Sequence, residues 1–339
     1  MKISLGAIVF CISLAFLTDI IFEKYIVYSN DHSNAGKINR LLQSDDKTEI
    51  PIFGSSIARN NYYPDSIDHN VFNYGMKGAI FEVVEPLMKI EFGKDKSTPI
   101  IYNFHHLTFL SSPGSSIQLS NFVPFIENEN IKDLLQKNGL YKDYMKVRGL
   151  RFYGCYTDYI KEHLRPYLDK NETISKGAVH TNAPDKATFD QHIRKRQIMI
   201  DDKFALIEKR RTSPAIFTKE DSLKLSRLES LLLFKPKKTE VDRFENLISQ
   251  NKNRTVILIY TPQHRSKLKG IENIEELNTF LADLEGRHDN LKILNYSNID
   301  LPDEYFKDTG HLSLKGAQKF SGILNDDLNT LLNDGHVNQ

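Results

Sequence analysis

Five short apolar runs, separated by stretches with helical spacing, constrain the fold of this 339-residue chain more than any other feature. The runs are Ile50–Phe53, Val71–Tyr74, Thr98–Tyr102, Arg254–Tyr260 and Leu291–Asn295. The helical stretches are Ile80–Phe92, Ile271–Leu284 and Leu314–Leu332. The runs do not alternate apolar with polar residues, which is typical of strands in a parallel sheet that is covered on both faces. The pattern therefore predicts a three-layer α/β/α protein with a central, mostly parallel five-stranded sheet.

About 150 residues between the third and fourth runs interrupt this alternation. Leu107–Pro124 is rich in Ser, Pro and Gly and indicates a loop, whereas the chain from Ile131 to about Gln250 has mostly helical spacing, with polar interruptions at Asn171–Asp185. A crossover between parallel strands needs only about a dozen residues. The excess predicts a mainly helical insertion over the C-terminal edge of the sheet. The expected parts are a membrane anchor (1–22), a stalk (23–48), the first part of the sheet domain (49–110), the insertion (111–250) and the second part of the sheet domain (251–335).

Within the insertion, His192–Arg211 carries seven Lys or Arg residues against three Asp or Glu residues. Such a run is typical of a solvated helix face. A surface that meets anionic lipid headgroups or an acidic glycan is the alternative.

The segment Ile3–Ile21 has 19 residues and one charge, Asp19. At 1.5 Å per residue a helix of this length nearly spans a hydrocarbon core of about 30 Å, and Lys2 favours a cytoplasmic N-terminus. Cleavage of a signal peptide after Ser13-Leu-Ala15 is the alternative, but it would leave a very short apolar core. A buried first helix does not fit a segment that is apolar all round. We expect an uncleaved anchor that holds a large domain outside the cytoplasm.

The charge and cysteine content exclude several classes of protein. Forty-five basic and 44 acidic residues leave a net charge near zero, which gives no indication of nucleic-acid binding. The two cysteines, Cys11 and Cys155, are far apart and predict neither a disulfide framework nor a zinc site of the paired-cysteine type. The histidines form no metal pattern with carboxylates, so we expect neither a metal nor another cofactor.

Two motifs about 250 residues apart contain residues that could form a catalytic site. The first strand ends in Gly54-Ser-Ser56, which places a serine at the C-terminal edge of the sheet, where open α/β folds bind their ligands. After the last strand comes Asp308-Thr-Gly-His311. At this spacing the carboxylate can hold one imidazole nitrogen, which leaves the other free to accept a proton from a serine.

These motifs occur in an order that resembles the sequence blocks of the SGNH/GDSL-type hydrolase superfamily. The blocks are Phe53-Gly-Ser-Ser56, Asn73-Tyr-Gly-Met-Lys-Gly78, the strand that ends at Asn103, and Asp308-x-x-His311. The resemblance covers roughly Ile50–His106 and Thr255–Leu332. The stretch Pro302–Ser321 is similar to a membrane-anchored branch of the superfamily, which includes the D-alanyl transfer protein of lipoteichoic acid modification and alginate-acetylation proteins. Members of that branch commonly work beside membrane-bound O-acyltransferases on envelope polymers.

The resemblance implies a role for each matching residue. Ser56 would be the nucleophile, His311 the general base and Asp308 the residue that orients it. The oxyanion hole would consist of the backbone N–H groups of Ser56 and Gly78 and the side chain of Asn103. Two positions differ from the family pattern: Ser55 replaces the usual aspartate before the nucleophile, and Tyr102-Asn103-Phe104 lacks the usual nearby glycine.

Three further residues are candidates for substrate binding. Arg59 follows Ser56 by three residues and is therefore expected on the same helix face, where it could contact an anionic or acyl substrate. The alternative is a surface arginine without a binding role. His105, beside His106, and His264 follow the third and fourth strands, where loop histidines without a ligand role are also common.

The resemblance implies a bacterial, single-pass inner-membrane protein whose domain is periplasmic or otherwise extracytoplasmic. We expect it to use a Ser-His-Asp triad as an acyltransferase or esterase on acyl groups of cell-envelope polysaccharide. Its expected partners are the bilayer, through Ile3–Ile21, an envelope glycan or acyl donor, and a membrane-bound O-acyltransferase. The alternatives are a periplasmic carbohydrate esterase or lipase, and a non-catalytic glycan-binding partner of such an acyltransferase.

Overall fold

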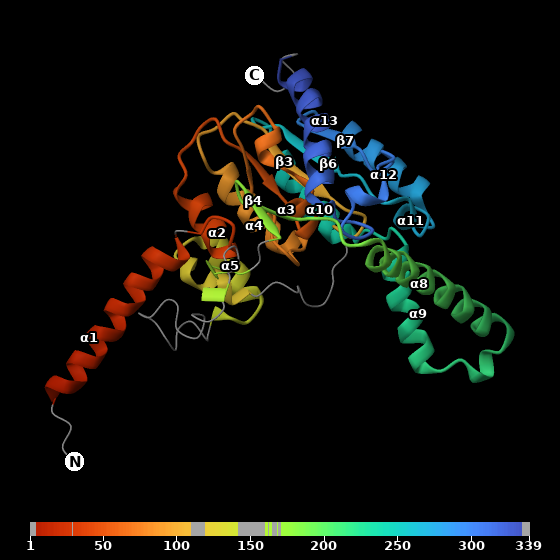
Figure 1. The fold of residues 1–339 in the computed structure, drawn as a ribbon, viewed down its shortest axis with the longest axis horizontal. Coiled ribbons are helices and arrows are strands. Elements are labelled where there is room, and N and C mark those ends of the chain that lie inside the picture. The colour runs from red at the N-terminus through yellow and green to blue at the C-terminus, as the bar shows by residue number, and fades with distance from the viewer. Residues whose placement is uncertain are drawn as a thin grey trace.

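The computed structural model describes residues 5–28, 30–109, 119–141 and 171–333, together with residues 160, 161, 163, 164 and 168. Five strands form a parallel sheet in the order β2-β1-β3-β6-β7 (Figure 1). They are β1 (Ile50–Phe53), β2 (Val71–Asn73), β3 (Ile100–Phe104), β6 (Val256–Tyr260) and β7 (Leu291–Asn295). The predicted α/β/α fold is confirmed, and the strands lie within two residues of their predicted bounds.

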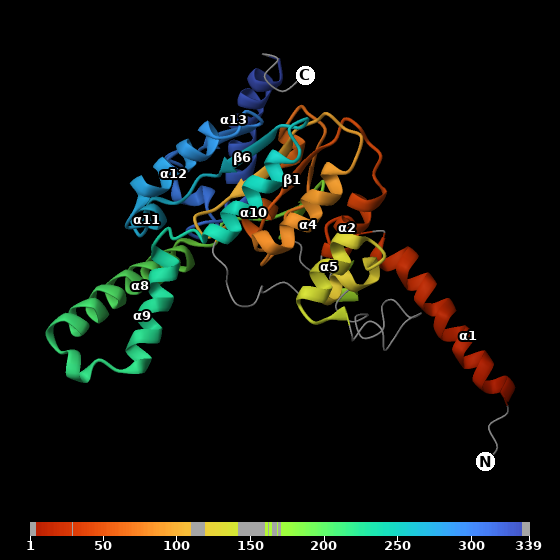
Figure 2. The same cartoon turned by 180° about the vertical axis from the view of Figure 1, so that it is seen from behind.

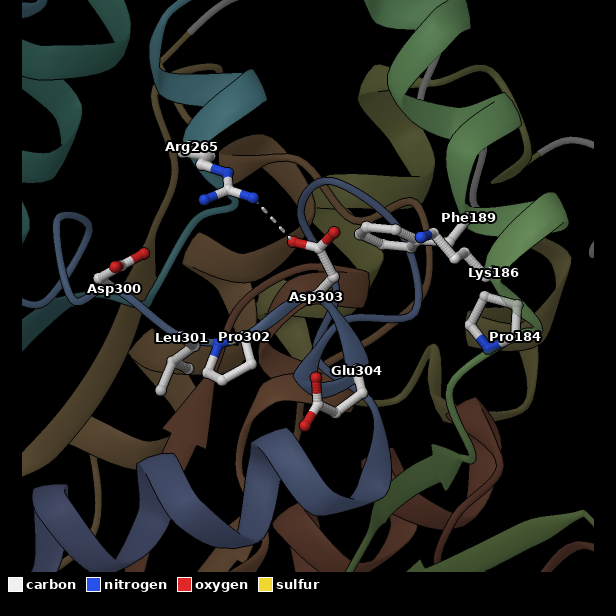
Figure 3. A pocket seen from close by; sticks show the side chains of 9 residues that line it. All are labelled: Pro184, Lys186, Phe189, Arg265, Asp300, Leu301, Pro302, Asp303 and Glu304. Atoms are coloured by element: carbon white, nitrogen blue, oxygen red, sulfur yellow. Dashed lines mark hydrogen bonds and ion pairs between the residues drawn. The ribbon is translucent and has the colours of Figure 1, made fainter.

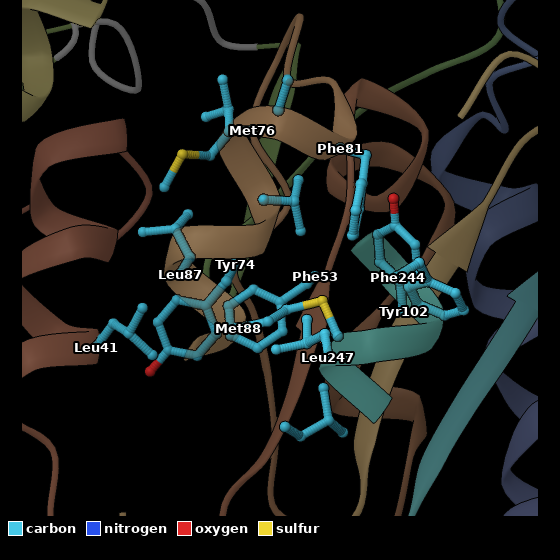
Figure 4. Close-up of a cluster of buried hydrophobic side chains, with 14 of the residues drawn as sticks. Leu41, Phe53, Tyr74, Met76, Phe81, Leu87, Met88, Tyr102, Phe244 and Leu247 are labelled. Carbon is cyan, nitrogen blue, oxygen red and sulfur yellow. The ribbon is translucent and has the colours of Figure 1, made fainter. Parts of the chain in front are cut away.

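Helices cover both faces of the sheet (Figures 1 and 2). The core on one face contains side chains of α2 (Asn34–Gln43), α4 (Phe81–Phe92), α5 (Glu129–Lys137), α10 (Lys238–Ser249) and α12 (Ile274–Gly286), with α5 packed on α4. The other face packs against α3 (Ser56–Asn61) and α13 (Leu314–Asn333). Successive strand residues point to opposite faces, so Tyr102 joins the first core and Ile101 the second. Figure 4 shows the first core, where Phe53, Tyr74 and Met88 lie between the sheet and α4.

The N-terminal helix α1 (Leu5–Phe22) continues into a π-helical turn, Glu23–Val27. Gly6–Val27 is long and apolar enough to cross a membrane. The helix protrudes from the domain (Figure 1), and large apolar side chains such as Phe10 are exposed, Phe10 by 67%. The charged residue Asp19, by contrast, is buried.

The expected stalk, residues 23–48, is instead largely part of the domain. Within it, α2 buries Ala35, Ile38 and Leu41 against the first core. Lys37 is fully buried, and its Nζ donates a hydrogen bond to the carbonyl oxygen of Gly75 at 2.5 Å. The apolar residues are spaced three apart on one helix face, a short amphipathic pattern that the surrounding Asn and Ser residues conceal.

The insertion contains strands as well as helices. The polar interruption expected at Asn171–Asp185 forms an antiparallel hairpin of β4 (Glu172–Ser175) and β5 (Ala178–Thr181). Lys176 and Gly177 adopt positive φ angles of 38° and 84° in its turn, and the backbone N–H of Asn73 donates to the carbonyl of Lys176. Two four-residue strands are too short for periodicity to distinguish them from a loop.

The hairpin is followed by two long helices, α8 (Lys186–Thr212) and α9 (Lys219–Leu232), which extend away from the sheet as an arm (Figures 1 and 2). Phe189, in the first turns of α8, packs edge-to-face on His264 with ring centres 5.3 Å apart. The first half of α8 and the β4–β5 hairpin therefore lie near the sheet edge, whereas the whole insertion was expected to cover it. Part of the expected loop, Leu107–Pro124, lies in a 3₁₀ helix, Leu119–Phe125, that buries Phe122. Residues 110–118 and 142–159, including Cys155, lie outside the described residues.

Candidate active site

Ser56 is held at the C-terminal end of β1 by a sharp turn. Gly54 has a φ of 148°, and a Cβ there would lie 2.8 Å from the Cβ of Ala58. Ser55 then caps α3, because its hydroxyl accepts a hydrogen bond from the N–H of Ile57 at 3.3 Å. Ser56 is the first helical residue, so its own N–H has no intrahelical acceptor.

Asp308 and His311 lie in a tight turn that is closed by an antiparallel bridge between Phe306 and Leu312. Oδ1 of Asp308 accepts hydrogen bonds from the backbone N–H groups of Gly310 (2.8 Å) and His311 (2.9 Å). Its Oδ2 lies 2.8 Å from Nδ1 of His311. The turn thus fixes the carboxylate through one oxygen and presents the other to the imidazole.

The turn brings His311 to Ser56, 255 residues away, with Nε2 2.9 Å from Oγ. Burial opposes the ionisation of Asp308, but the hydrogen bond and charge of His311, with the two backbone donors, outweigh it and hold the pKa of Asp308 well below its ordinary value. An ionised carboxylate only accepts hydrogen bonds, so Nδ1 of His311 carries a proton. In the neutral imidazole, Nε2 is then the acceptor for the Ser56 hydroxyl.

Asn61, the last residue of α3, connects the two motifs, although sequence reasoning did not single it out. Its Oδ1 accepts from the N–H of Leu312 at 2.9 Å. Its Nδ2 donates to Thr261 Oγ1 at 2.9 Å and to the carbonyl of Gly310 at 3.3 Å. The side chain is fully buried. An asparagine in a polar stretch gives no sign of these long-range partners.

Of the expected oxyanion donors, Gly78 lies beside Ser56, whereas the amide group of Asn103 is directed elsewhere. Gly78 has a φ of 77° and lines the same cavity as Ser56 and His311. Asn103 also lines this cavity, but its Nδ2 donates to the carbonyl of Ile259 (3.1 Å) and to the Tyr62 hydroxyl (3.2 Å). Both amide hydrogens are therefore directed away from Ser56. The expected oxyanion role of Asn103 does not fit this geometry, because the neighbouring strand supplies the better acceptor.

Ser56 and His311 open onto two cavities. The larger, of about 440 Å³, has an apolar wall that includes Ile80 and Phe81, and polar residues that include His105 and Lys267. The smaller, of about 170 Å³, is mainly polar and is lined by Arg59, Lys77, Lys307 and the β4–β5 hairpin. Two of the three residues predicted to bind substrate, Arg59 and His105, therefore lie beside the triad. Lys267 and the hairpin were not anticipated.

His264, the third of these residues, lies elsewhere. It is buried between Phe189 and Phe306, and its Nε2 lies 3.1 Å from Asp303 Oδ1. Asp303 lines a separate cavity of about 560 Å³ between α8, the loop before α13 and the short helix α11 (Arg265–Leu268). Figure 3 shows Arg265 and Asp303 facing each other there. His264 lines neither that cavity nor the two cavities that Ser56 and His311 line, so the structure does not bring it to the triad.

Within the described part of the chain, no three His, Cys, Asp or Glu side chains are close enough together to hold a metal ion. The chemistry that the arrangement can perform is that of an activated hydroxyl: a serine, an imidazole that accepts its proton and a carboxylate that orients the imidazole.

Two solved structures resemble this chain distantly. No protein-family profile matches the chain. No curated protein matches its sequence. A Streptococcus pneumonia structure, provisionally described as a platelet activating factor, matches 92% of this chain and 98% of its own, with 11% identity and a TM-score of 0.36. An acetyl xylan esterase from the rumen bacterium Butyrivibrio proteoclasticus matches 84% of this chain and 64% of its own, with 12% identity and a TM-score of 0.32. At these values the likenesses assign no activity.

Proposed function

We propose that this protein is a serine esterase or acyltransferase that works through a covalent ester on Ser56. The observation that carries the proposal is the hydrogen-bonded series from Ser56 Oγ through His311 to Asp308, with distances of 2.9 Å and 2.8 Å. The series lies at the C-terminal edge of a parallel sheet and opens onto a cavity with an apolar wall.

The reaction begins when His311 Nε2 accepts the proton of Ser56 as Oγ attacks the carbonyl carbon of an ester. The negative charge then forms on the carbonyl oxygen, where the backbone N–H of Ser56 and that of Gly78 are the proposed donors. His311 returns the proton to the leaving alcohol. In the second half of the reaction, the hydroxyl of water or of a sugar gives its proton to His311 and attacks the carbonyl carbon of the Ser56 ester. The bond to Ser56 Oγ then breaks, His311 returns the proton to Oγ, and the acyl group leaves on the acceptor.

We further propose that α1 anchors the protein in a bacterial inner membrane, with the site outside the cytoplasm. The apolar length of Gly6–Val27 and the exposure of its side chains support an anchor. The proposed substrates are acyl groups of envelope polysaccharide, and the proposed partner is a membrane-bound O-acyltransferase. The resemblance of Pro302–Ser321 to the membrane-anchored branch of the SGNH/GDSL superfamily supports this part.

The proposal is tested with a fluorophosphonate probe on the full chain in detergent. The wild type should be labelled, Ser56→Ala should not, and His311→Ala should react at least on the order of 10³-fold more slowly. Ser226→Ala, on an exposed position of α9, is the matched control and should react like the wild type. A folded wild type without labelling, alone and in native membranes, would contradict the proposal and favour a non-catalytic glycan-binding role.

The acceptor is tested separately by partition of the acyl group. The protein is given an aryl ester with increasing concentrations of a soluble oligosaccharide, and the released acid and acylated sugar are measured. A transferase should divert acyl groups to the sugar at millimolar concentrations, far below the roughly 55 M of water. Release of the acid alone would assign the protein to the esterases.

A further inference from the structure

Lys267 is a buried cation in the larger cavity of the site. It is 9% exposed and lines this cavity together with Ser56 and His311. A Cβ added to Gly310 would lie 2.4 Å from its Nζ, which places the ammonium group beside the turn that carries His311. The charged groups that act on it are Asp308, which is already held by His311, and Arg196, which is also positive.

Two further donors lie near Lys267. Arg196 packs on Gly270, and its Nε and Nη2 are buried and meet no acceptor among the residues described. This edge of a guanidinium group can bind a carboxylate or phosphate in a bidentate manner. Here it lies against Gly270, and Arg196 does not line the cavity, so Arg196 acts on the site through its charge. The charge of Arg196 acts on both Lys267 and His105, so the three groups belong to one electrostatic cluster.

His105 contributes a fixed donor to the same cavity. Its Nδ1 accepts a hydrogen bond from the N–H of Leu107 at 3.2 Å, so the neutral ring carries its proton on Nε2. Burial, with the nearby positive charges, lowers the pKa of His105 well below its ordinary value and keeps the ring neutral. Nε2 is buried and has no acceptor among the described residues.

Keeping a positive charge on a buried lysine is costly, so burial favours the neutral amine in the resting molecule. Burial and the charge of Arg196, only partly opposed by Asp308, lower the pKa of Lys267 to about 7. A transient oxyanion would offset this cost only during the reaction, whereas a bound anionic ligand would offset it for as long as it occupies the site.

We propose that Lys267, supported by Arg196 and His105, forms an anion subsite in the Ser56 cavity, where the substrate places a carboxylate or phosphate group beside its ester. The reference to an ester rests on the function proposed above, whereas the binding of an anion does not. The subsite makes an acidic substrate the preferred one.

Binding is measured first, by titration calorimetry of inorganic phosphate and of succinate with the full chain in detergent. The wild type and Ser56→Ala should bind one or both anions at millimolar concentrations or tighter, and Lys267→Met should bind at least tenfold more weakly. Lys269→Met, which removes an exposed ammonium group two residues away, is the matched control. The preferred anion indicates whether the group is a phosphate or a carboxylate. No binding by the folded wild type, or equal binding by Lys267→Met, would overturn the proposal.

Turnover then distinguishes a substrate anion from the oxyanion. The p-nitrophenyl esters of succinate and butyrate have acyl chains of equal length, and only the first has a free carboxylate. In the wild type the ratio of their kcat/KM values should favour the succinate ester, and in Lys267→Met this ratio should fall at least tenfold. A loss of equal size for both esters would assign Lys267 to the oxyanion and overturn the anion subsite. Anion binding without any Ser56-dependent turnover would instead contradict the proposed function alone.

Discussion

Asn61 and Leu312, 251 residues apart, are joined by a hydrogen bond of 2.9 Å from the backbone N–H of Leu312 to the Asn61 side-chain oxygen. Asn61 ends the helix that begins with Ser56, and Leu312 follows His311 directly. The bond therefore sets the position of the imidazole relative to the hydroxyl, independently of the hydrogen bond between those two groups. In enzymes generally, a displacement of a reacting group by about 1 Å can lower the rate on the order of 100-fold.

Replacement of Asn61 should separate the two halves of the site. We expect Asn61→Ala to lower kcat at least tenfold, because the imidazole of His311 is no longer held in position relative to Ser56. KM should change little, because the groups that bind substrate remain. The free energy of unfolding should fall by about 1 to 3 kcal/mol, since Leu312 N–H and Thr261 lose a buried partner. Steady-state kinetics and urea denaturation measure both effects. Asn138→Ala, at the end of α5, is the control; if it lowered kcat as much, the assignment of Asn61 would be wrong.

Replacement of Asp308 should affect catalysis through the imidazole tautomer. In Asp308→Asn the side-chain amide can donate to Nδ1, which moves the imidazole proton to Nε2, where it can no longer accept from Ser56. We expect kcat to fall by on the order of 10³- to 10⁴-fold, with fluorophosphonate labelling reduced in parallel. Labelling at the wild-type rate would show that Ser56 is activated by another group.

The same variant should change the pH dependence of stability. Because the pKa of Asp308 is depressed in the fold, its ionisation stabilises the protein above the unfolded-state pKa of about 4, and this contribution is lost as the pH falls through the lower folded value. Asp308→Asn should therefore be less stable than the wild type at pH 7, and the difference should shrink at pH 3. Thermal melts at both pH values test this. A difference that does not depend on pH would contradict it.

The burial of Lys267 should lower the free energy of unfolding at pH values where its amine is charged in the unfolded chain. Its pKa of about 7 lies below the value of about 10.4 in an unfolded chain, so the unfolded state binds more protons between these limits. Between pH 6 and pH 9 the free energy of unfolding of the wild type should rise by about 2 to 3 kcal/mol more than that of Lys267→Met. Consequently Lys267→Met should be the more stable protein at pH 6, by a margin that narrows at pH 9. Parallel curves for the two proteins would refute a depressed pKa.

A methyl group at Gly75 should disturb the loop that carries Gly78. A Cβ there would lie 2.5 Å from the backbone nitrogen of Arg59 and 2.8 Å from Asn73 Oδ1, and neither atom can move freely. We expect Gly75→Ala to lower kcat by tenfold or more, because the backbone near the proposed oxyanion site shifts. Gly286→Ala is a matched control, since a Cβ there meets no atom within 4 Å. Equal kcat values for the two variants would separate this loop from catalysis.

Much of the domain could be predicted because its determinants are local. Each buried strand is a short apolar run, and Gly54 and the serines after it have the composition of a strand-to-helix turn. The D-x-x-H spacing alone allows Asp308 to reach His311, because both lie in one turn. Errors arose where the local signal was weak: α2 has only four apolar residues in a polar stretch, and the β4–β5 hairpin has four residues in each strand.

The sequence by itself determined the parallel sheet, the apolar N-terminal helix and the presence of a serine and an Asp-His pair at the ends of strands. Only the tertiary structure decided which side chains share the site. It places Ser56 Oγ 2.9 Å from Nε2 of His311 and directs the amide of Asn103 toward Ile259 and Tyr62. It also packs His264 between Phe189 and Phe306, away from the triad, and places Lys267 in the cavity of the site. The physical reason is that backbone periodicity depends on neighbours within a few residues. Side-chain partners, by contrast, depend on contacts between elements that are distant in the sequence, where the burial of polar groups requires each one to find a partner.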